Sequence, residues 1–172
     1  MRIVGVCLVL LVFFGCKSKR AVVSELTNKE EIMSCPEGGI CSFQVETNKK
    51  LALKTDQTGM LYPDITEGQD ILLKYIYEKE TDANIQDASY QEAVYINLKK
   101  EQLNLQAESL KPFNIVFARL CFCKGESGYF RVKNGRIKVE TLRENSYRLV
   151  LKFQAEGIPQ VINEINQVFR LP

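Results

Sequence analysis

The chain has 172 residues, of which 45% are hydrophobic and 26% are charged. Because it contains no histidine, Ser-His-Asp and Cys-His catalysis, imidazole metal ligation and a histidine-based pH switch are excluded. The 23 Lys and Arg residues nearly balance the 21 Asp and Glu residues, and a formal charge of +2 gives no electrostatic footprint for binding nucleic acid.

The N-terminus has the pattern of an export signal. Arg2 is followed by an uncharged run over residues 3–14. This run is shorter than the roughly 20 apolar residues that span a bilayer, which favours the core of a signal peptide. The run ends in Gly15 and Cys16. Residues 1–16 resemble a bacterial lipoprotein signal, in which a small residue precedes the modified cysteine. The resemblance implies cleavage after Gly15 and acyl chains on Cys16.

A lipid on Cys16 would attach the protein to a membrane of the bacterial cell envelope, since several acyl chains anchor firmly where one binds only marginally. In lipoproteins of this kind, Asp directly after the cysteine often marks retention in the inner membrane. Lys17 stands at that position, which favours the outer membrane. Two alternatives remain open: a secreted protein with an unmodified Cys16, and an N-terminal anchor helix that is never cleaved.

The sequence divides into three expected parts. Residues 1–15 form the cleaved signal peptide, residues 16–33 form a lipid-anchored tether, and residues 34–172 form a single β-rich globular domain. A chain of this size buries roughly 68–70% of the surface that it exposes when unfolded, so one core is sufficient. The alternative for residues 17–33 is a first element that packs on the domain.

Alternation of apolar and polar residues begins after Cys35 and predicts half-buried strands. Because both faces of the later segments are partly apolar, some of these strands are expected to be covered on each side. The expected strands span residues 41–45, residues 51–55 after a turn at Asn48-Lys49, residues 71–77 and residues 94–98.

Residues 113–154 predict a four-strand antiparallel meander. Residues 115–123 are nearly continuously apolar, which is typical of a central strand covered on both faces. Asn134-Gly135 is a strong signal for a type I′ hairpin turn. The other three strands are expected over residues 129–133, 137–142 and 147–153.

Two helices are expected besides the strands. Residues 101–110 are rich in helix formers and precede Pro112. After Pro159, apolar residues recur at helical spacing up to Phe169, which predicts a C-terminal helix that packs on the sheet. The predicted fold class is therefore mainly β, a compact antiparallel sandwich or barrel with a meander and one packed C-terminal helix.

Four cysteines are left for the domain: Cys35, Cys41, Cys121 and Cys123. An even number in an exported chain indicates disulfides. Residues two apart on a strand have Cβ atoms about 6.6 Å apart, whereas a bridge needs about 3.8 Å. We therefore expect crosswise bridges between the two pairs. The alternatives are a local Cys35–Cys41 bridge with the other two strained together or free, a thiolate metal site, and a redox site that lacks the usual Cys-x-x-Cys spacing.

Three arginines are candidates to face a ligand: Arg119, Arg131 and Arg148. Arg119 falls inside the apolar strand, where its charge must be paired, lie at a sheet edge or line an opening. Seven tyrosines are also more than a small core needs and favour a recognition surface.

No pattern of catalytic carboxylates, metal ligands or cofactor-binding residues stands out in the sequence, so we expect neither catalysis nor a cofactor. The sequence favours a non-enzymatic binding domain of the cell envelope with a protein or glycan partner. The alternatives are a structural or assembly subunit of an envelope complex, and a cysteine-based metal-binding or redox protein.

Overall fold

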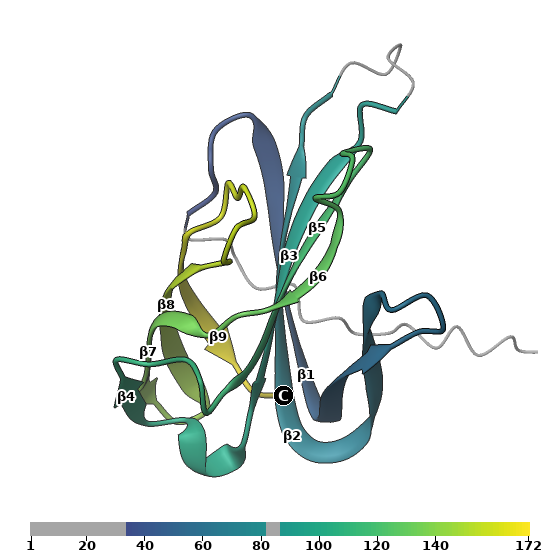
Figure 1. Ribbon diagram of the computed structural model, residues 1–172. Helices are drawn as coiled ribbons and strands as arrows, with labels where there is room; N and C mark the ends of the chain where they lie inside the picture. The colour runs from purple at the N-terminus through teal and green to yellow at the C-terminus, as the bar shows by residue number, and fades with distance from the viewer. Residues whose placement is uncertain (1–33, 82–86) are drawn as a thin grey trace, which may run out of the picture.

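The computed structural model describes residues 34–81 and 87–172, and it is built almost entirely from two antiparallel β-sheets (Figure 1). The expected signal peptide, the lipidated Cys16 and the tether up to residue 33 lie outside these described residues. The prediction of a mainly β, antiparallel fold is confirmed. Neither sheet closes into a barrel over the described ranges.

The larger sheet has five strands in the order β1-β2-β3-β5-β6. Its members are β1 (Gly39–Thr55), β2 (Leu61–Lys79), β3 (Tyr90–Leu98), β5 (Asn114–Cys121) and β6 (Gly128–Arg131). The smaller sheet has four strands in the order β4-β7-β8-β9. Its members are β4 (Leu105–Ala107), β7 (Asn134–Arg143), β8 (Ser146–Gln154) and β9 (Glu164–Arg170).

The main core lies between the two sheets, where alternate residues of each strand point inward. Phe43 of β1 contacts Phe169 of β9, and Phe117 of β5 contacts Phe153 of β8. The burial of each side chain of this size stabilises the folded state by roughly 1.5–3 kcal/mol. Tyr75 is also buried here, where desolvation raises its pKa to about 12 and its hydroxyl donates to the Ser34 carbonyl at 2.6 Å.

A second, smaller core lies on the outer face of the five-stranded sheet, because the long β1–β2 hairpin bends back over that face. Leu51 of the hairpin packs on Tyr95 and Val116. Its N–H donates to Asn97 Oδ1 at 3.2 Å, and its carbonyl accepts from Asn114 Nδ2 at 2.6 Å. The predicted turn at Asn48-Lys49 is therefore wrong: β1 runs through it, and the register shifts there mark a bulge that bends the strand.

The predicted meander is right in its two hairpins and wrong in between. β5 pairs with β6 and β7 pairs with β8, but β6 and β7 belong to different sheets. Asn134-Gly135 is the start of β7 rather than a hairpin turn. The chain crosses between the sheets here because Val132 enters the core, where its N–H donates to the Ile115 carbonyl at 3.0 Å.

Both predicted helices are also wrong. Residues 101–110 hold only the end of a short 3₁₀ turn (Lys100–Gln102), followed by β4. The C-terminal segment forms β9, whose inward-facing residues are Ile165, Gln167 and Phe169. The polar Gln167 at an inward position breaks the apolar alternation, so the remaining apolar residues match a helical period instead.

Candidate recognition surface at the loop end

One end of the molecule gathers several connections between strands (Figure 1). β1 and β3 begin there, and β2 and β5 end there, as the pairing of Gly39 with Lys79 and of Tyr90 with Cys121 shows. We call this region the loop end. It comprises residues 34–40, 78–81, 87–90, the β5–β6 loop (121–127) and the β8–β9 loop (155–163).

Two disulfides lie at the loop end, Cys35–Cys41 and Cys121–Cys123. The expected crosswise pairing is wrong, because β2 and β3 separate β1 from β5. Three strand spacings amount to about 14 Å, whereas a bridge needs Cα atoms within about 7 Å. The alternative of a local Cys35–Cys41 bridge, with Cys121 and Cys123 bonded to each other, is correct instead. β5 ends at Cys121, so the chain leaves the extended conformation and its Cα comes within 5.2 Å of that of Cys123.

The Cys121–Cys123 bridge encloses a single residue, Phe122, which is 82% exposed. The loop behind it is closed by hydrogen bonds. Ser127 Oγ accepts from the Cys121 N–H at 3.4 Å, and the Cys123 carbonyl accepts from the Glu126 N–H at 3.4 Å. The phenyl ring is thus presented to solvent on a backbone that is clamped on both sides.

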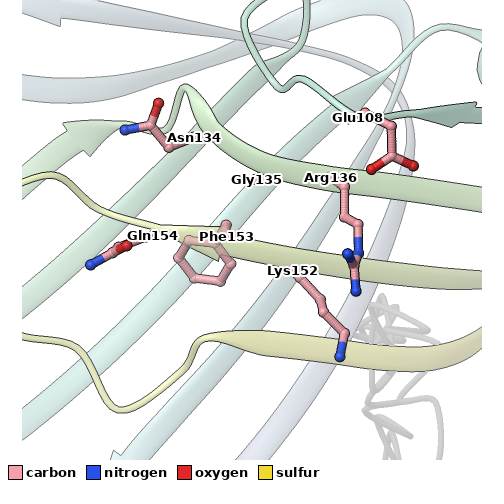
Figure 2. A pocket seen from close by; sticks show the side chains of 7 residues that line it. All are labelled: Glu108, Asn134, Gly135, Arg136, Lys152, Phe153 and Gln154. Atoms are coloured by element: carbon pink, nitrogen blue, oxygen red, sulfur yellow. The ribbon is translucent and has the colours of Figure 1, made fainter.

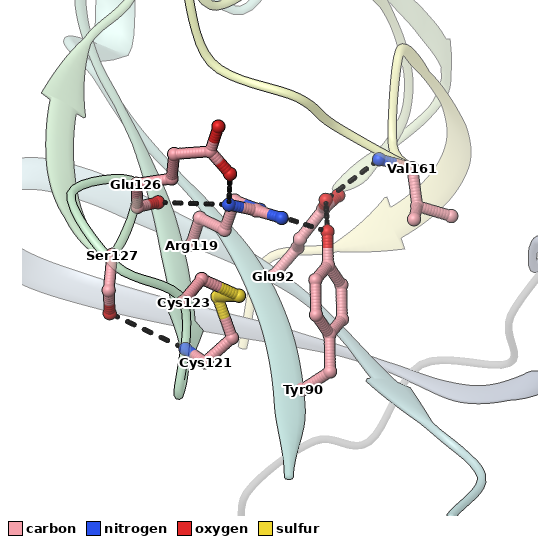
Figure 3. A network of polar contacts seen from close by, with 8 residues as sticks. All are labelled: Tyr90, Glu92, Arg119, Cys121, Cys123, Glu126, Ser127 and Val161. Atoms are coloured by element: carbon pink, nitrogen blue, oxygen red, sulfur yellow. Dashed lines mark hydrogen bonds and ion pairs between the residues drawn. A yellow bond between two sulfur atoms is a disulfide. The ribbon is translucent and has the colours of Figure 1, made fainter. Parts of the chain in front are cut away.

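Arg119 holds this loop through Glu126 (Figure 3). Its side chain is 9% exposed, and Nη1 binds both the Glu126 carboxylate at 2.8 Å and the Glu126 carbonyl at 3.2 Å. Nε donates to the Tyr90 hydroxyl at 3.3 Å, and the guanidinium lies 5.3 Å from the centre of the Tyr90 ring. The hydrogen bond with Tyr90 raises the pKa of Arg119, so the guanidinium stays charged.

Glu92 extends the network to the β8–β9 loop. It is fully buried, and its two carboxylate oxygens accept from the Val161 and Ile162 N–H groups at 2.7 Å each. The Tyr90 hydroxyl also donates to this carboxylate. Burial, and then the hydrogen bond with Glu92, raise the pKa of Tyr90, which keeps its hydroxyl protonated as a donor. One polar network therefore joins β3, β5 and two loops.

The three arginines do not converge on one ligand position. Arg119 is buried in the network above, as its ion-pair interpretation predicts. Arg131 is exposed at the end of β6. Arg148 lies on β8 in the other sheet, where its Nη1 is 3.9 Å from Glu140. The hydrogen bond from Lys138 lowers the pKa of Glu140, which keeps this partly exposed carboxylate ionised.

A second candidate is a pocket of about 420 Å³ on the outer face of the four-stranded sheet (Figure 2). Arg136 and Lys152 are cross-strand partners there. Lys152 is already paired with Glu164 at 2.8 Å, so its charge is compensated. The lining is Glu108, Asn134, Gly135, Arg136, Lys152, Phe153 and Gln154. Because Phe153 points into the core, no exposed ring is available to stack on a sugar among these residues.

Sequence reasoning missed Phe122 and Glu92. The sequence shows Phe122 as an aromatic residue between two cysteines. Because a buried strand was predicted over residues 115–123, Phe122 was assigned to that strand and not to an exposed loop. Glu92 is visible as a charge in phase with Val94 and Ile96, the inward-facing residues of β3. A charge at such a position must be fully hydrogen-bonded, which predicts a partner from another element.

Metal binding finds no support in the geometry. Within residues 34–81 and 87–172, no three or more Cys, Asp or Glu side chains are grouped to hold a metal ion. The thiolate metal site requires free thiols, but Cys35, Cys41, Cys121 and Cys123 are disulfide-bonded. In the same ranges, no helix has the length and apolar character needed to cross a membrane.

Comparison with known proteins finds no matching family model, no matching curated protein and no matching solved structure.

Proposed function

We propose that this chain is a lipid-anchored, non-enzymatic binding domain of the bacterial cell envelope, and that it binds a protein partner through the loop end. The observation that carries the proposal is the exposed Phe122 ring, clamped by the disulfide between its two neighbours. The anchor is the lipid on Cys16 that the N-terminal segment implies.

An aromatic ring held in place before binding is a strong basis for protein recognition. Phe buries a large apolar area when it enters a pocket. Because the backbone on both sides is already fixed, little further conformational entropy is lost on binding. Anchor residues of this kind account for about 2 kcal/mol or more of the affinity in protein interfaces.

Two more exposed apolar side chains lie on the same end of the molecule. Ile40, next to the Cys35–Cys41 bridge, is 64% exposed, and Val161, held by Glu92, is 38% exposed. Exposed aliphatic side chains such as Ile40 and Val161 suit a protein surface better than a glycan, which is recognised mainly by polar groups and stacked rings.

The anchor is tested by the intact mass of the protein extracted from membranes. We expect a mass that corresponds to residues 16–172 plus acyl chains, and no alkylation of thiols before reduction. A Cys16→Ser variant should remain unprocessed and lose the lipid mass. An unlipidated wild-type N-terminus would contradict the anchor, and alkylation before reduction would contradict the two disulfides.

The binding site is tested with a photo-crosslinking phenylalanine analogue at position 122 of the full-length protein in its native envelope. We expect one discrete protein adduct, because the ring of residue 122 lies in the partner's pocket. With the identified partner, Phe122→Ala should weaken binding by about 30-fold, which corresponds to about 2 kcal/mol. The stability of the domain should change by less than about 0.5 kcal/mol, since the ring is exposed.

The matched control places the same analogue at position 142. Leu142 is also an exposed apolar residue, at 44%, but it lies near the β7–β8 turn, away from the loop end. Adducts of equal yield from positions 122 and 142 would contradict a specific site, as would the absence of any protein adduct from position 122.

A further inference from the structure

We infer that the partner protein presents an apolar cleft bordered by lysine and arginine side chains. This inference rests on the proposed function and specifies the chemistry of the partner. It follows from the charges that the loop end carries together with its exposed apolar side chains.

The loop end is acidic although the whole chain carries a formal charge of +2. Among the described residues of the loop end, the exposed cations are Lys79 and Lys124. The exposed carboxylates outnumber them, and they come from four separate segments: Glu37, Glu78, Glu80, Asp87 and Glu156.

The one buried cation of this region, within the described residues, does not offset these carboxylates. Arg119 is covered by the β5–β6 loop and is neutralised by Glu126 at 2.8 Å. An incoming partner therefore meets Phe122 and Ile40 on an end of the molecule whose exposed charges are mostly negative. Exposed charges act over a Debye length of about 8 Å at physiological ionic strength, so these carboxylates act on the partner residues that dock next to them.

Basic side chains gather elsewhere, on the outer face of the four-stranded sheet. The inward positions of β7, β8 and β9 are apolar apart from Gln167, and the alternate positions face outward. The outward positions carry Arg136, Lys138, Arg148, Lys152 and Arg170, with Glu140 and Glu164 among them. The tertiary structure thus separates the charges of a nearly neutral chain.

This separation argues against a lipid surface as the occupant of the loop end. A phenyl ring beside a lysine is also suited to a membrane interface, but bacterial membranes are rich in anionic lipids, which repel carboxylates. Lysine and arginine side chains at the border of a protein cleft attract these carboxylates instead, which accelerates association.

The test uses the photo-crosslinker at position 122 in the full-length, membrane-anchored protein, combined with charge reversal. The variant carries Glu80→Lys and Glu156→Lys, which place positive charge at the loop end. The matched control carries Glu101→Lys and Glu144→Lys, which change the net charge equally at exposed positions away from the loop end. The yield of the adduct is measured at low and at high salt, and its mass identifies a protein or a lipid.

We expect a protein adduct whose yield falls about tenfold in the loop-end variant at low salt, falls with added salt for the wild type, and is unchanged in the control variant. A protein adduct whose yield is insensitive to salt and to both variants would contradict the inference that lysine and arginine side chains border the partner's cleft, but it would leave the proposed function intact. A lipid adduct, or no adduct at position 122, would overturn both the proposed function and this inference.

Discussion

Gly135→Val is expected to lower the free energy of unfolding by about 4 kcal/mol or more, so that little folded domain remains. Gly135 lies in β7 with φ = +138°, where it faces Phe153 of β8. A Cβ atom there would lie 2.1 Å from the Lys152 carbonyl oxygen and 2.7 Å from Phe153 Cα. Both are backbone atoms of a paired strand, so neither can move without breaking the β7–β8 ladder. The denaturant midpoint of unfolding measures the effect.

Gly157→Val is the matched control for this prediction. Gly157 also has a positive φ, +71°, but a Cβ atom there would meet nothing within 4 Å. Its cost comes from the backbone conformation alone and should be about 1–2 kcal/mol. Equal losses in the two variants would show that the close approach of β8 is not the cause. A sequence-based explanation through a type I′ turn predicts the same direction for Gly135→Val, but through a turn that does not exist.

Glu92→Ala is expected to lower the free energy of unfolding by about 3 kcal/mol. The variant removes the acceptor of the Val161 and Ile162 N–H groups and of the Tyr90 hydroxyl at once. The Ile162 N–H is then left without a partner in the buried interior, and the Val161 N–H and the Tyr90 hydroxyl lose theirs at partly buried positions. Amide hydrogen exchange at residues 161 and 162 should accelerate more than exchange in β8, because the β8–β9 loop loses its attachment to β3.

Tyr90→Phe separates the contributions within this network. It removes one hydrogen bond to Glu92 and one from Arg119 but leaves the carboxylate bonded to both backbone N–H groups. We expect a loss of about 1 kcal/mol and unchanged hydrogen exchange at residues 161 and 162. If Glu92→Ala were no more destabilising than Tyr90→Phe, the carboxylate would not be what holds the β8–β9 loop.

Local patterns predicted much of the fold. The period-two alternation located β1, β2, β3 and the strands of the two later hairpins, because a half-buried strand leaves this signature whatever its partners are. The Arg119 ion pair was also foreseeable, since a charge inside an apolar strand must be compensated. Phe122 was not, because nothing local distinguishes the last residue of a buried strand from the first residue of an exposed loop.

The sequence by itself indicated that this protein is mainly β, that disulfides form among its domain cysteines and that its N-terminus has the pattern of a lipoprotein signal. Only the tertiary structure decided which cysteines pair, which sheet receives β7, that the C-terminal segment is a strand, and that exposed carboxylates from four segments lie at the same end as Phe122. These features depend on residues far apart in the chain: β2 and β3 lie between the two cysteine pairs, Glu92 meets residues 161 and 162, and Val132 enters the core between the sheets. Periodicity and turn signals report each residue's nearest neighbours, whereas strand order and charge separation arise from long-range packing.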